Sequence, residues 1–329
     1  MGIARRARRA LKQMILGPWD FPQQCTVGLR DPQSEVTVWL SGLGTPRDVT
    51  QSHIMACGAP FTIGIGFDGQ QNDLVESGTR LSLRFHERDG EQQLLGEIGL
   101  QYSSSLDAGR QQLYLFRVSH YRNYCLPKLQ LWARYLQYAR LRRGVQHPDV
   151  PITAREIHAM AVFFICPRPV VLVSVADGGM GNVFPMNLMG PIGNGYFAFA
   201  LNSTRAAAQL VERTGRVALS SIPVEQASVA YQLAGNHRKP CSDWNQFPFA
   251  TTMSTTLGVP VPGFALRVRE MQVEATRKMG SHTLFVARTI RDEAREDGNH
   301  FFVVHGIYQA WRQKMNRAQP SGAQVEAQV

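Results

Sequence analysis

The segment VADGGMGNVFPMNLMG, residues 175–190, has the residue types of a nucleotide-binding loop. Glycine lacks a Cβ atom, so a glycine-rich backbone can approach a phosphate group closely. A dinucleotide-binding fingerprint needs a third glycine after Gly179 and Gly181, but Phe184 stands at that position. A P-loop needs Gly-Lys-Ser/Thr, and the segment contains no lysine. Both interpretations fail, and the glycines instead indicate a hairpin turn with positive φ angles.

Three consecutive residues further along the chain have the chemistry of a phosphate site. Ser203, Thr204 and Arg205 lie at the start of the predicted helix TRAAAQLVERTG, so hydroxyls, a guanidinium group and backbone N–H groups come together there. This combination suits a phosphate dianion, because the helix dipole and the charged donor act in the same sense. The ordinary alternative is an N-cap with a solvated arginine, and this helix alone leaves the choice open.

The elements that must position these residues are mostly strands. The apolar runs PRPVVLVSV, GYFAFAL and RVALSSI predict strands, and GNVFPMNLM predicts a loop or a further strand. Three long strand candidates follow: FALRVREMQVEATRKM, HTLFVARTIRDEARED and HFFVVHGIYQAW. We therefore expect a β-rich C-terminal unit, residues 151–312, and a disordered tail, residues 313–329, that lacks apolar periodicity.

Residues 1–150 predict a second β-rich unit. Residues 25–118 contain runs of β-formers separated by turn residues, and RDGEQQ indicates a hairpin. The period then changes to that of a helix, with apolar residues at Leu129, Trp132, Leu136 and Ala139. The segment GVQHPDVP follows this helix and marks the end of the unit. The number of strands also allows a diverged barrel that packs like a second subunit, although no motif supports it and no repeat of short period is present.

The net charge of +10 is concentrated in two blocks. Residues 1–17, which predict a short amphipathic helix, and residues 108–148 are basic and free of acidic residues, whereas residues 18–107 are predominantly acidic. The second block interleaves aromatic residues with arginines, which suits nucleic acid, an anionic membrane surface or a partner protein. The simpler interpretation is a core helix whose arginine stems cover apolar surface. We do not expect nucleic acid as a partner, and we keep peripheral membrane or partner docking through the basic N-terminal half as an alternative.

The composition limits the class of protein. A hydrophobic content of 44% with 18% charged residues is typical of a soluble globular protein. Five cysteines without C-x-x-C spacing indicate neither a zinc ribbon nor a disulfide scaffold, so we expect a cytoplasmic protein. The histidines show no metal-ligand spacing, and the sequence contains no G-x-S-x-G nucleophile elbow.

Residues 166–290 resemble the flavin reductase-like family, whose fold is an FMN-binding split β-barrel. The resemblance rests on segments in the family's order and spacing: PRPVVLVS, GNVFPMNLM after a glycine turn, TGRVALSS after a helix, and GSHTLFVA at Gly280–Ala287. The fold class that it implies is mostly β with a few helices, α+β. The split barrel would follow the β-rich N-terminal domain and the basic amphipathic helix at its end.

The resemblance also implies a site. FMN, with FAD as an alternative, would be the cofactor, and NAD(P)H would be the co-substrate. His282 matches a family histidine associated with the reduced nicotinamide and is the candidate catalytic residue, preceded by Ser281 where the family usually has Asp. The candidate cofactor-binding residues are Asn182, Met186, Asn187, Leu188, Met189, Ser203, Thr204 and Arg205.

The first functional hypothesis is therefore an NAD(P)H:flavin reductase, which transfers hydride from nicotinamide to flavin and serves a partner oxygenase. Because such barrels usually hold the flavin at a dimer interface, the resemblance implies a homodimer. Two alternatives stay open. One is a flavin-binding docking or sensory protein that uses the basic N-terminal half, and the other is a flavin-dependent oxidase or oxygenase of a small organic substrate.

Overall fold

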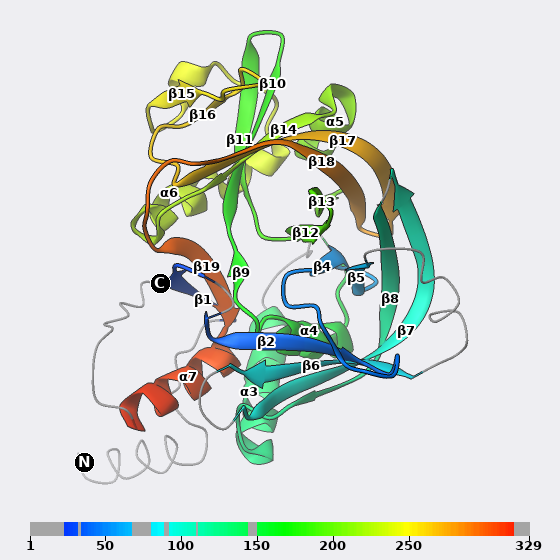
Figure 1. The fold of residues 1–329 in the computed structure, drawn as a ribbon. Helices are drawn as coiled ribbons and strands as arrows, with labels where there is room; N and C mark the ends of the chain where they lie inside the picture. Colours follow the sequence, from blue (N-terminus) through cyan, green and yellow to red (C-terminus); the bar gives the residue numbers. More distant parts are fainter. Residues whose placement is uncertain are drawn as a thin grey trace, which may run out of the picture.

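The computed structural model describes residues 23–31, 34–67, 80–88, 92–109, 111–143 and 150–318. Most strands lie in two seven-stranded antiparallel sheets, which Figure 1 shows one above the other. The N-terminal sheet has the order β3-β2-β6-β7-β8-β5-β4, with strands β2 (Val36–Ser41), β3 (Arg47–Asp48), β4 (His53–Cys57), β5 (Thr62–Phe67), β6 (Leu81–Glu87), β7 (Leu94–Ala108) and β8 (Gln111–Asn123). The C-terminal sheet has the order β11-β10-β14-β17-β18-β13-β12, with strands β10 (Val171–Asp177), β11 (Met180–Met186), β12 (Met189–Gly193), β13 (Tyr196–Asn202), β14 (Arg216–Ser221), β17 (Arg267–Met279) and β18 (His282–Ala294).

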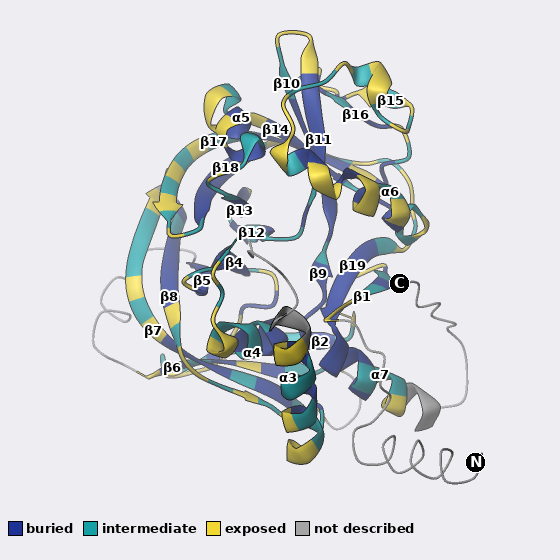
Figure 2. Cartoon of the chain, turned by 180° about the vertical axis from the view of Figure 1, so that it is seen from behind, coloured by how far each residue is buried: buried dark blue, intermediate teal, exposed yellow. Residues whose placement is uncertain are grey.

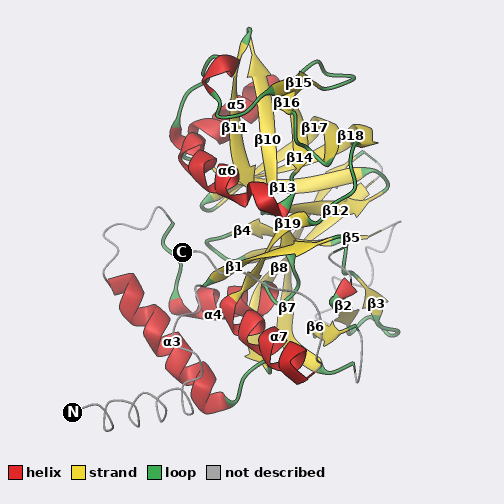
Figure 3. Cartoon of the chain, turned by 90° about the vertical axis from the view of Figure 1, so that its left-hand side faces the viewer, coloured by secondary structure: helices red, strands yellow, loops and turns green. Residues whose placement is uncertain are grey.

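Helices lie beside the sheets (Figure 3). The α-helices are α3 (Lys128–Arg143), α4 (Ala154–Phe163), α5 (Ala206–Thr214), α6 (Ala227–Gln232) and α7 (Gly306–Ala318), and the 3-10 helices are η2 (Val224–Gln226), η3 (Leu233–Arg238) and η4 (Trp244–Gln246). Two small sheets complete the fold, β1 (Gln24–Leu29) with β19 (His300–His305) and β9 (Arg168–Pro169), and β15 (Thr251–Met253) with β16 (Pro260–Pro262). The α+β class predicted from the sequence is confirmed.

The two large sheets have the same topology. Replacing β10, β11, β12, β13, β14, β17 and β18 by β2, β3, β4, β5, β6, β7 and β8 converts one strand order into the other. The β7–β8 and β17–β18 hairpins agree in detail, because a shift of 171 residues relates their turn glycines, Gly109 and Gly280, which both have positive φ angles. The same shift relates the bulged residues Ser103 and Ser119 to Glu274 and Ile290. Bulges are specific features of a strand pair. The N-terminal half is therefore a second copy of the same barrel, the possibility that the strand number allowed.

The two copies face each other through corresponding strands. Strands β4 and β5 of the N-terminal sheet pack against β12 and β13 of the C-terminal sheet, and all four lie near the middle of the molecule in Figure 1. Every residue of β4 and β5 is buried, as is all of β13 except Asn202 (Figure 2). These strands read as continuous apolar runs because both of their faces are covered.

The halves also exchange elements. Strand β1 comes from the N-terminal half but pairs with β19, from Gln24 opposite His305 to Leu29 opposite His300. One hydrophobic cluster includes residues of both halves, from Val27 and Val36 to Val304 and Trp311. A boundary near residue 150 thus divides the chain, but it does not divide the packing.

Two sequence-based predictions are corrected at the C-terminal end. The strand predicted through residue 311 ends at His305, and α7 begins at Gly306. This helix continues to Ala318, so residues 313–318 are helical although they were predicted to be disordered. The helix is held by its buried residues Ile307, Tyr308 and Trp311, and by Arg312, whose guanidinium pairs with Glu35. The periodicity of α7 was hidden because its apolar residues directly follow those of β19.

The helix predicted at the end of the N-terminal unit is present as α3, but it buries a different face. Leu129 and Trp132 are 74% and 65% exposed, whereas Leu131, Arg134 and Tyr138 are buried. Tyr135, between them, stacks on His158 of α4 with ring centroids 3.7 Å apart. Arginine and tyrosine side chains share this packing face with Leu131, so the apolar pattern of Leu129, Trp132, Leu136 and Ala139 misses it.

The predicted N-terminal helix, residues 1–17, lies outside the described residues, as does most of the linker GVQHPDVP. Within the described part of the chain, every helix is too short or too polar to cross a membrane.

Candidate functional site

A cavity of about 510 Å³ opens at one end of the C-terminal sheet. The β11–β12 connection, the end of β13, the start of α5 and the 3-10 helix η3 form its walls, and His282 at the start of β18 also lines it. The lining residues are Val150, Pro185, Met186, Asn187, Leu188, Ala200, Leu201, Asn202, Arg205, Ala234, Gly235, His237, Arg238 and His282. Its volume and its mixture of apolar and polar groups are typical of a small-molecule or cofactor site, for which ~300–1,000 Å³ is usual.

Hydrogen bonds between side chains and backbone hold η3 against β11. The Asn182 side chain donates to the carbonyl oxygens of Asn236 and Lys239 at 2.9 and 3.1 Å, and the Asn236 side chain donates to the Val183 carbonyl at 2.9 Å. His237 Nε2 lies 2.7 Å from the Pro185 carbonyl, to which it donates because a carbonyl only accepts. Burial lowers the pKa of His237, so its ring is neutral in this contact. This wall of the cavity is therefore fixed by polar contacts rather than by apolar packing alone.

The N-terminus of α5 lies at the rim of the cavity. Arg205 is its N-cap residue and makes no side-chain capping bond, while it lines the cavity. Thr204 donates from both its N–H and its hydroxyl to Asn202 Oδ1, at 3.0 and 2.8 Å. The dipole and the N–H groups of a helix N-terminus favour an anion. The hydroxyl N-cap considered for Ser203 and Thr204 is not formed, because Asn202 binds Thr204 and the helix begins later.

His282 is almost completely enclosed, with 8% of its surface exposed. Burial lowers its pKa to about 4, because the charged imidazolium loses its hydration, so the ring is neutral at pH 7. The Gly58 N–H donates to Nδ1 at 3.3 Å, and the Ser281 hydroxyl lies 2.7 Å from the same atom. A backbone N–H only donates, so Nδ1 is the acceptor and the ring proton resides on Nε2. His282 can thus offer one hydrogen-bond donor, Nε2–H.

Five of the nine predicted site residues share this cavity: Met186, Asn187, Leu188, Arg205 and His282. The other four do not line it. Asn182 holds the η3 wall from behind, Met189 is buried in β12, Thr204 is bonded to Asn202, and the Ser203 hydroxyl lies 3.3 Å from that of Thr283.

The sequence reasoning missed three polar lining residues, Asn202, His237 and Arg238. Asn202 directly precedes the predicted phosphate segment and had a signal as the polar end of an apolar strand. His237 and Arg238 lie in AGNHRKP, whose only sequence signal is a cluster of polar residues before a proline. Their place in the cavity depends on how the connection folds back on β11.

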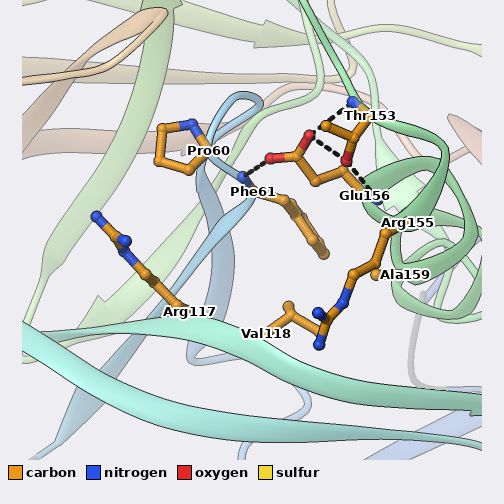
Figure 4. Close-up of a pocket in the computed structure, with 8 residues that line it drawn as sticks. All are labelled: Pro60, Phe61, Arg117, Val118, Thr153, Arg155, Glu156 and Ala159. Carbon is orange, nitrogen blue, oxygen red and sulfur yellow. Dashed lines mark hydrogen bonds between the residues drawn. The ribbon is translucent and has the colours of Figure 1, made fainter.

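A second, smaller cavity of about 190 Å³ lies between α4 and the N-terminal sheet (Figure 4). Glu156 lies in its wall, and its carboxylate caps α4 by accepting from Thr153 while also accepting from the Phe61 N–H at 2.9 Å. Both roles are structural. They tie the turn between β4 and β5 to α4.

Residues 163–311 match the protein family described as flavin reductase like domain. This match lies in the C-terminal half of the chain and agrees with the family resemblance found in the sequence. The matched range ends within α7, and it includes every cavity-lining residue except Val150.

Three solved structures are similar to part of the chain. An FMN-binding protein from Thermus thermophilus with bound p-hydroxybenzaldehyde is 22% identical, with 40% of this chain and 73% of that chain covered and a TM-score of 0.36. An NADH:FAD oxidoreductase of Streptomyces globisporus is 17% identical, with 46% of this chain and 88% of that chain covered and a TM-score of 0.41. The styrene monooxygenase flavin reductase of Pseudomonas putida is 20% identical, with 45% of this chain and 92% of that chain covered and a TM-score of 0.38. No curated protein matches the chain.

Proposed function

We propose that the protein is an FMN-dependent NAD(P)H:flavin reductase whose site is the cavity around His282. The observation that carries the proposal is the position of His282 in a flavin reductase-like domain. It is neutral, has its tautomer set by its neighbours, and lines the same cavity as the N-terminus of α5. A cofactor-sized space, a neutral donor and an anion-favouring helix end are the parts that a flavin mononucleotide and a nicotinamide require.

The lining residues fit FMN. The α5 N-terminus and Arg205 would hold the phosphate, because a guanidinium and a helix N-terminus both favour a dianion. The backbone of Met186 to Leu188 would meet the pyrimidine edge of the ring system, and Leu201 supplies apolar wall beside it. Arg238, on η3, adds a second cation to the same cavity. FAD fits the cavity less well than FMN, because it carries a second phosphate and a nucleoside that need further space.

When bound, the flavin supplies the hydride-accepting chemistry, and the protein contributes position and the exclusion of water. His282 would direct Nε2–H at the nicotinamide or its carboxamide, and its low pKa keeps it a neutral donor rather than a general acid. The walls of β13 and η3 would exclude water from the contact between the two rings, on which hydride transfer depends.

The test is reduction of the purified protein under anaerobic conditions. We expect bound FMN, or FMN added at one equivalent, to lose the visible absorbance of an oxidised flavin on addition of NADH or NADPH. A protein that binds FMN but is not reduced by either nucleotide would leave the oxidase, oxygenase and sensory alternatives. A protein that binds neither FMN nor FAD in a calorimeter would reject the flavin site itself.

The homodimer, the partner oxygenase and docking through the basic N-terminal half remain proposals. Gel filtration with light scattering tests the first, and transfer of reduced flavin to an added oxygenase tests the second. For docking, the exposed Leu129 and Trp132 on α3 are the residues to change. A loss of pelleting with anionic vesicles in the double alanine variant would support a membrane surface.

A further inference from the structure

The turn between β4 and β5, in the N-terminal half, is in contact with His282. Gly58 N–H donates to His282 Nδ1 at 3.3 Å, and Ala59 N–H donates to Ser281 Oγ at 3.0 Å. The Ser281 hydroxyl, 2.7 Å from Nδ1, completes a chain of donors from Ala59 to the imidazole. A Cβ atom at Gly58 would lie 3.0 Å from His282 Cε1, so the turn also limits the ring sterically.

Further contacts join this turn to the β17–β18 hairpin. The Cys57 thiol donates to the Met279 carbonyl at 2.8 Å, and Ser281 N–H donates to the Ala59 carbonyl at 2.9 Å. On the far side of the turn, Glu156 accepts from Phe61 N–H (Figure 4). The turn is thus fixed at both ends, and His282 receives its position from a segment more than 220 residues away in the chain.

A corresponding contact runs in the other direction, from a turn of the C-terminal half to a strand of the N-terminal half. By the shift of 171 residues, Gln111 at the start of β8 corresponds to His282 at the start of β18. Asn194, in the β12–β13 turn of the C-terminal half, donates to Gln111 Oε1 at 3.0 Å. Each copy therefore places a hairpin turn against the first residue of a long strand in the other copy. The arrangement is that of a two-fold dimer built within one chain.

Among the described residues, the N-terminal copy has no counterpart of the segment that encloses the cavity in the C-terminal copy. The C-terminal half inserts residues 222–266, including η3, between β14 and β17, whereas only residues 88–93 connect the corresponding strands β6 and β7. Its equivalent of His282 is a glutamine whose amide donates to the Phe67 carbonyl at 2.7 Å. At Gly66, which corresponds to Ala200 in the cavity wall, a Cβ atom would lie 2.0 Å from the Ile192 carbonyl oxygen. The backbone of Ile192 therefore occupies the space beside Gly66, where the C-terminal copy has its cavity wall.

The two copies also differ in the charge of the segment at which the C-terminal half would bind a phosphate. Between β13 and β14 the C-terminal half has Ser203, Thr204 and Arg205 at the start of α5. In the sequence DGQQNDLVESGT, which lies at the corresponding place between β5 and β6, there are three acidic residues and no basic one. Like charges repel, so this segment does not suit a phosphate.

We propose that the N-terminal half is a built-in partner subunit that has lost cofactor binding and positions His282 through its Cys57–Ala59 turn, so that each chain binds one flavin. The inference rests on the proposed function for the nature of the ligand. The role assigned to Gly58 and Ala59 is that of positioning residues, which act through His282. The subunit contact that the family resemblance implies is then supplied within a single chain, so the site does not need the homodimer that the resemblance implies.

The first test is stoichiometry. Titration of the full-length protein with FMN in a calorimeter is expected to give one equivalent per chain, with chain mass measured by light scattering in the same sample. Two equivalents per chain would overturn the loss of the second site. Absence of binding by FMN and FAD would reject the proposed function, and the positioning role would still be decided by the NMR measurement in the second test, which needs no flavin.

The second test compares two glycine variants of the same hairpin. Gly58→Ala crowds His282, whereas Gly64→Ala crowds Ile54 Cγ1 at 2.9 Å and is remote from the imidazole. Imidazole ¹⁵N NMR of the wild-type protein is expected to show the Nε2–H tautomer for His282, and Gly58→Ala alone is expected to change that signal. In reduction assays Gly58→Ala is expected to lower the maximal rate of flavin reduction by about 10- to 100-fold, with the FMN dissociation constant unchanged. Equal signals and equal rates in the two variants would overturn the positioning role.

Discussion

The two halves of this chain have the same strand order and the same bulges in their long hairpins, β7–β8 and β17–β18, but different connections between the strands. In the C-terminal half the β14–β17 connection folds back as η3 and supplies Ala234, Gly235, His237 and Arg238 to the cavity. In the N-terminal half the corresponding strands are joined by residues 88–93. The comparison teaches that the strands determine the barrel, while one inserted connection and one helix start create the cavity. Loops on a rigid scaffold commonly carry the function in this way.

The largest expected effect tests whether the two copies are one cooperative unit. Phe285 stacks on Phe199 with ring centroids 5.1 Å apart, and its counterpart Tyr114 packs edge-on against Phe67 at 5.0 Å. Replacing either by alanine is expected to cost about 3–5 kcal/mol in the free energy of unfolding, because both are fully buried. Since the halves share one hydrophobic cluster and β1 pairs with β19, both variants should shift a single urea transition measured by circular dichroism. Two transitions, each moved by one variant, would contradict a shared core.

The second prediction concerns His282, which is a glutamine, Gln111, at the corresponding position of the N-terminal copy. His282 has a folded-state pKa of about 4 against an ordinary value of 6.5, so the unfolded state binds a proton that the folded state refuses as the pH falls from 6.5 to 4. Stability on the order of 3 kcal/mol, present above pH 6.5, should therefore be lost across this range. His282→Gln introduces the residue type of the N-terminal copy. This variant should lose less free energy of unfolding between pH 6.5 and pH 4, by that same amount. An unchanged slope would show that His282 is accessible to protons in the folded state.

A third, smaller effect concerns the two arginines at the ends of α5. Arg205→Ala is expected to weaken FMN binding by about 10- to 100-fold and to leave riboflavin binding unchanged, because a charge-assisted hydrogen bond contributes about 1.5–3 kcal/mol. Arg213→Ala is the matched control, since Arg213 lies in the last turn of α5 and pairs with Asp177 at 2.5 Å on the surface. Calorimetric titration with both ligands decides the matter. Equal losses for FMN and riboflavin would place Arg205 away from the phosphate.

The smallest effect concerns the wall that only one copy possesses among the described residues. Asn182→Ala removes the donor to the Asn236 and Lys239 carbonyls and is expected to cost about 1–3 kcal/mol, because buried acceptors then lose their partner. Hydrogen exchange should show faster exchange in η3 and unchanged exchange in β7 and β8. Uniform acceleration throughout both sheets would instead indicate global destabilisation.

Local patterns predicted much of the barrel and part of its site. The β10–β11 turn was identified from its glycines, and Gly178 and Gly179 have φ angles of 58° and 87°. The family resemblance orders the segments that contain Met186, Asn187, Leu188, Arg205 and His282, and these five residues line one cavity. The predicted buried face of α3 and the predicted disorder of residues 313–318 were wrong, because Arg134 and Tyr138 pack in α3 and Arg312 pairs with Glu35 in α7.

The sequence by itself determined the strands, the α+β class and the resemblance of the C-terminal half to a flavin reductase-like domain, because these depend on periodicity and short segments. Only the tertiary structure decided that the two halves are copies, that η3 closes the cavity, and that Gly58 and Ala59 contact the His282 segment. The reason is physical: each of these features depends on contacts between residues far apart in the chain. No local pattern of apolar or polar residues specifies which distant backbone N–H an imidazole will meet.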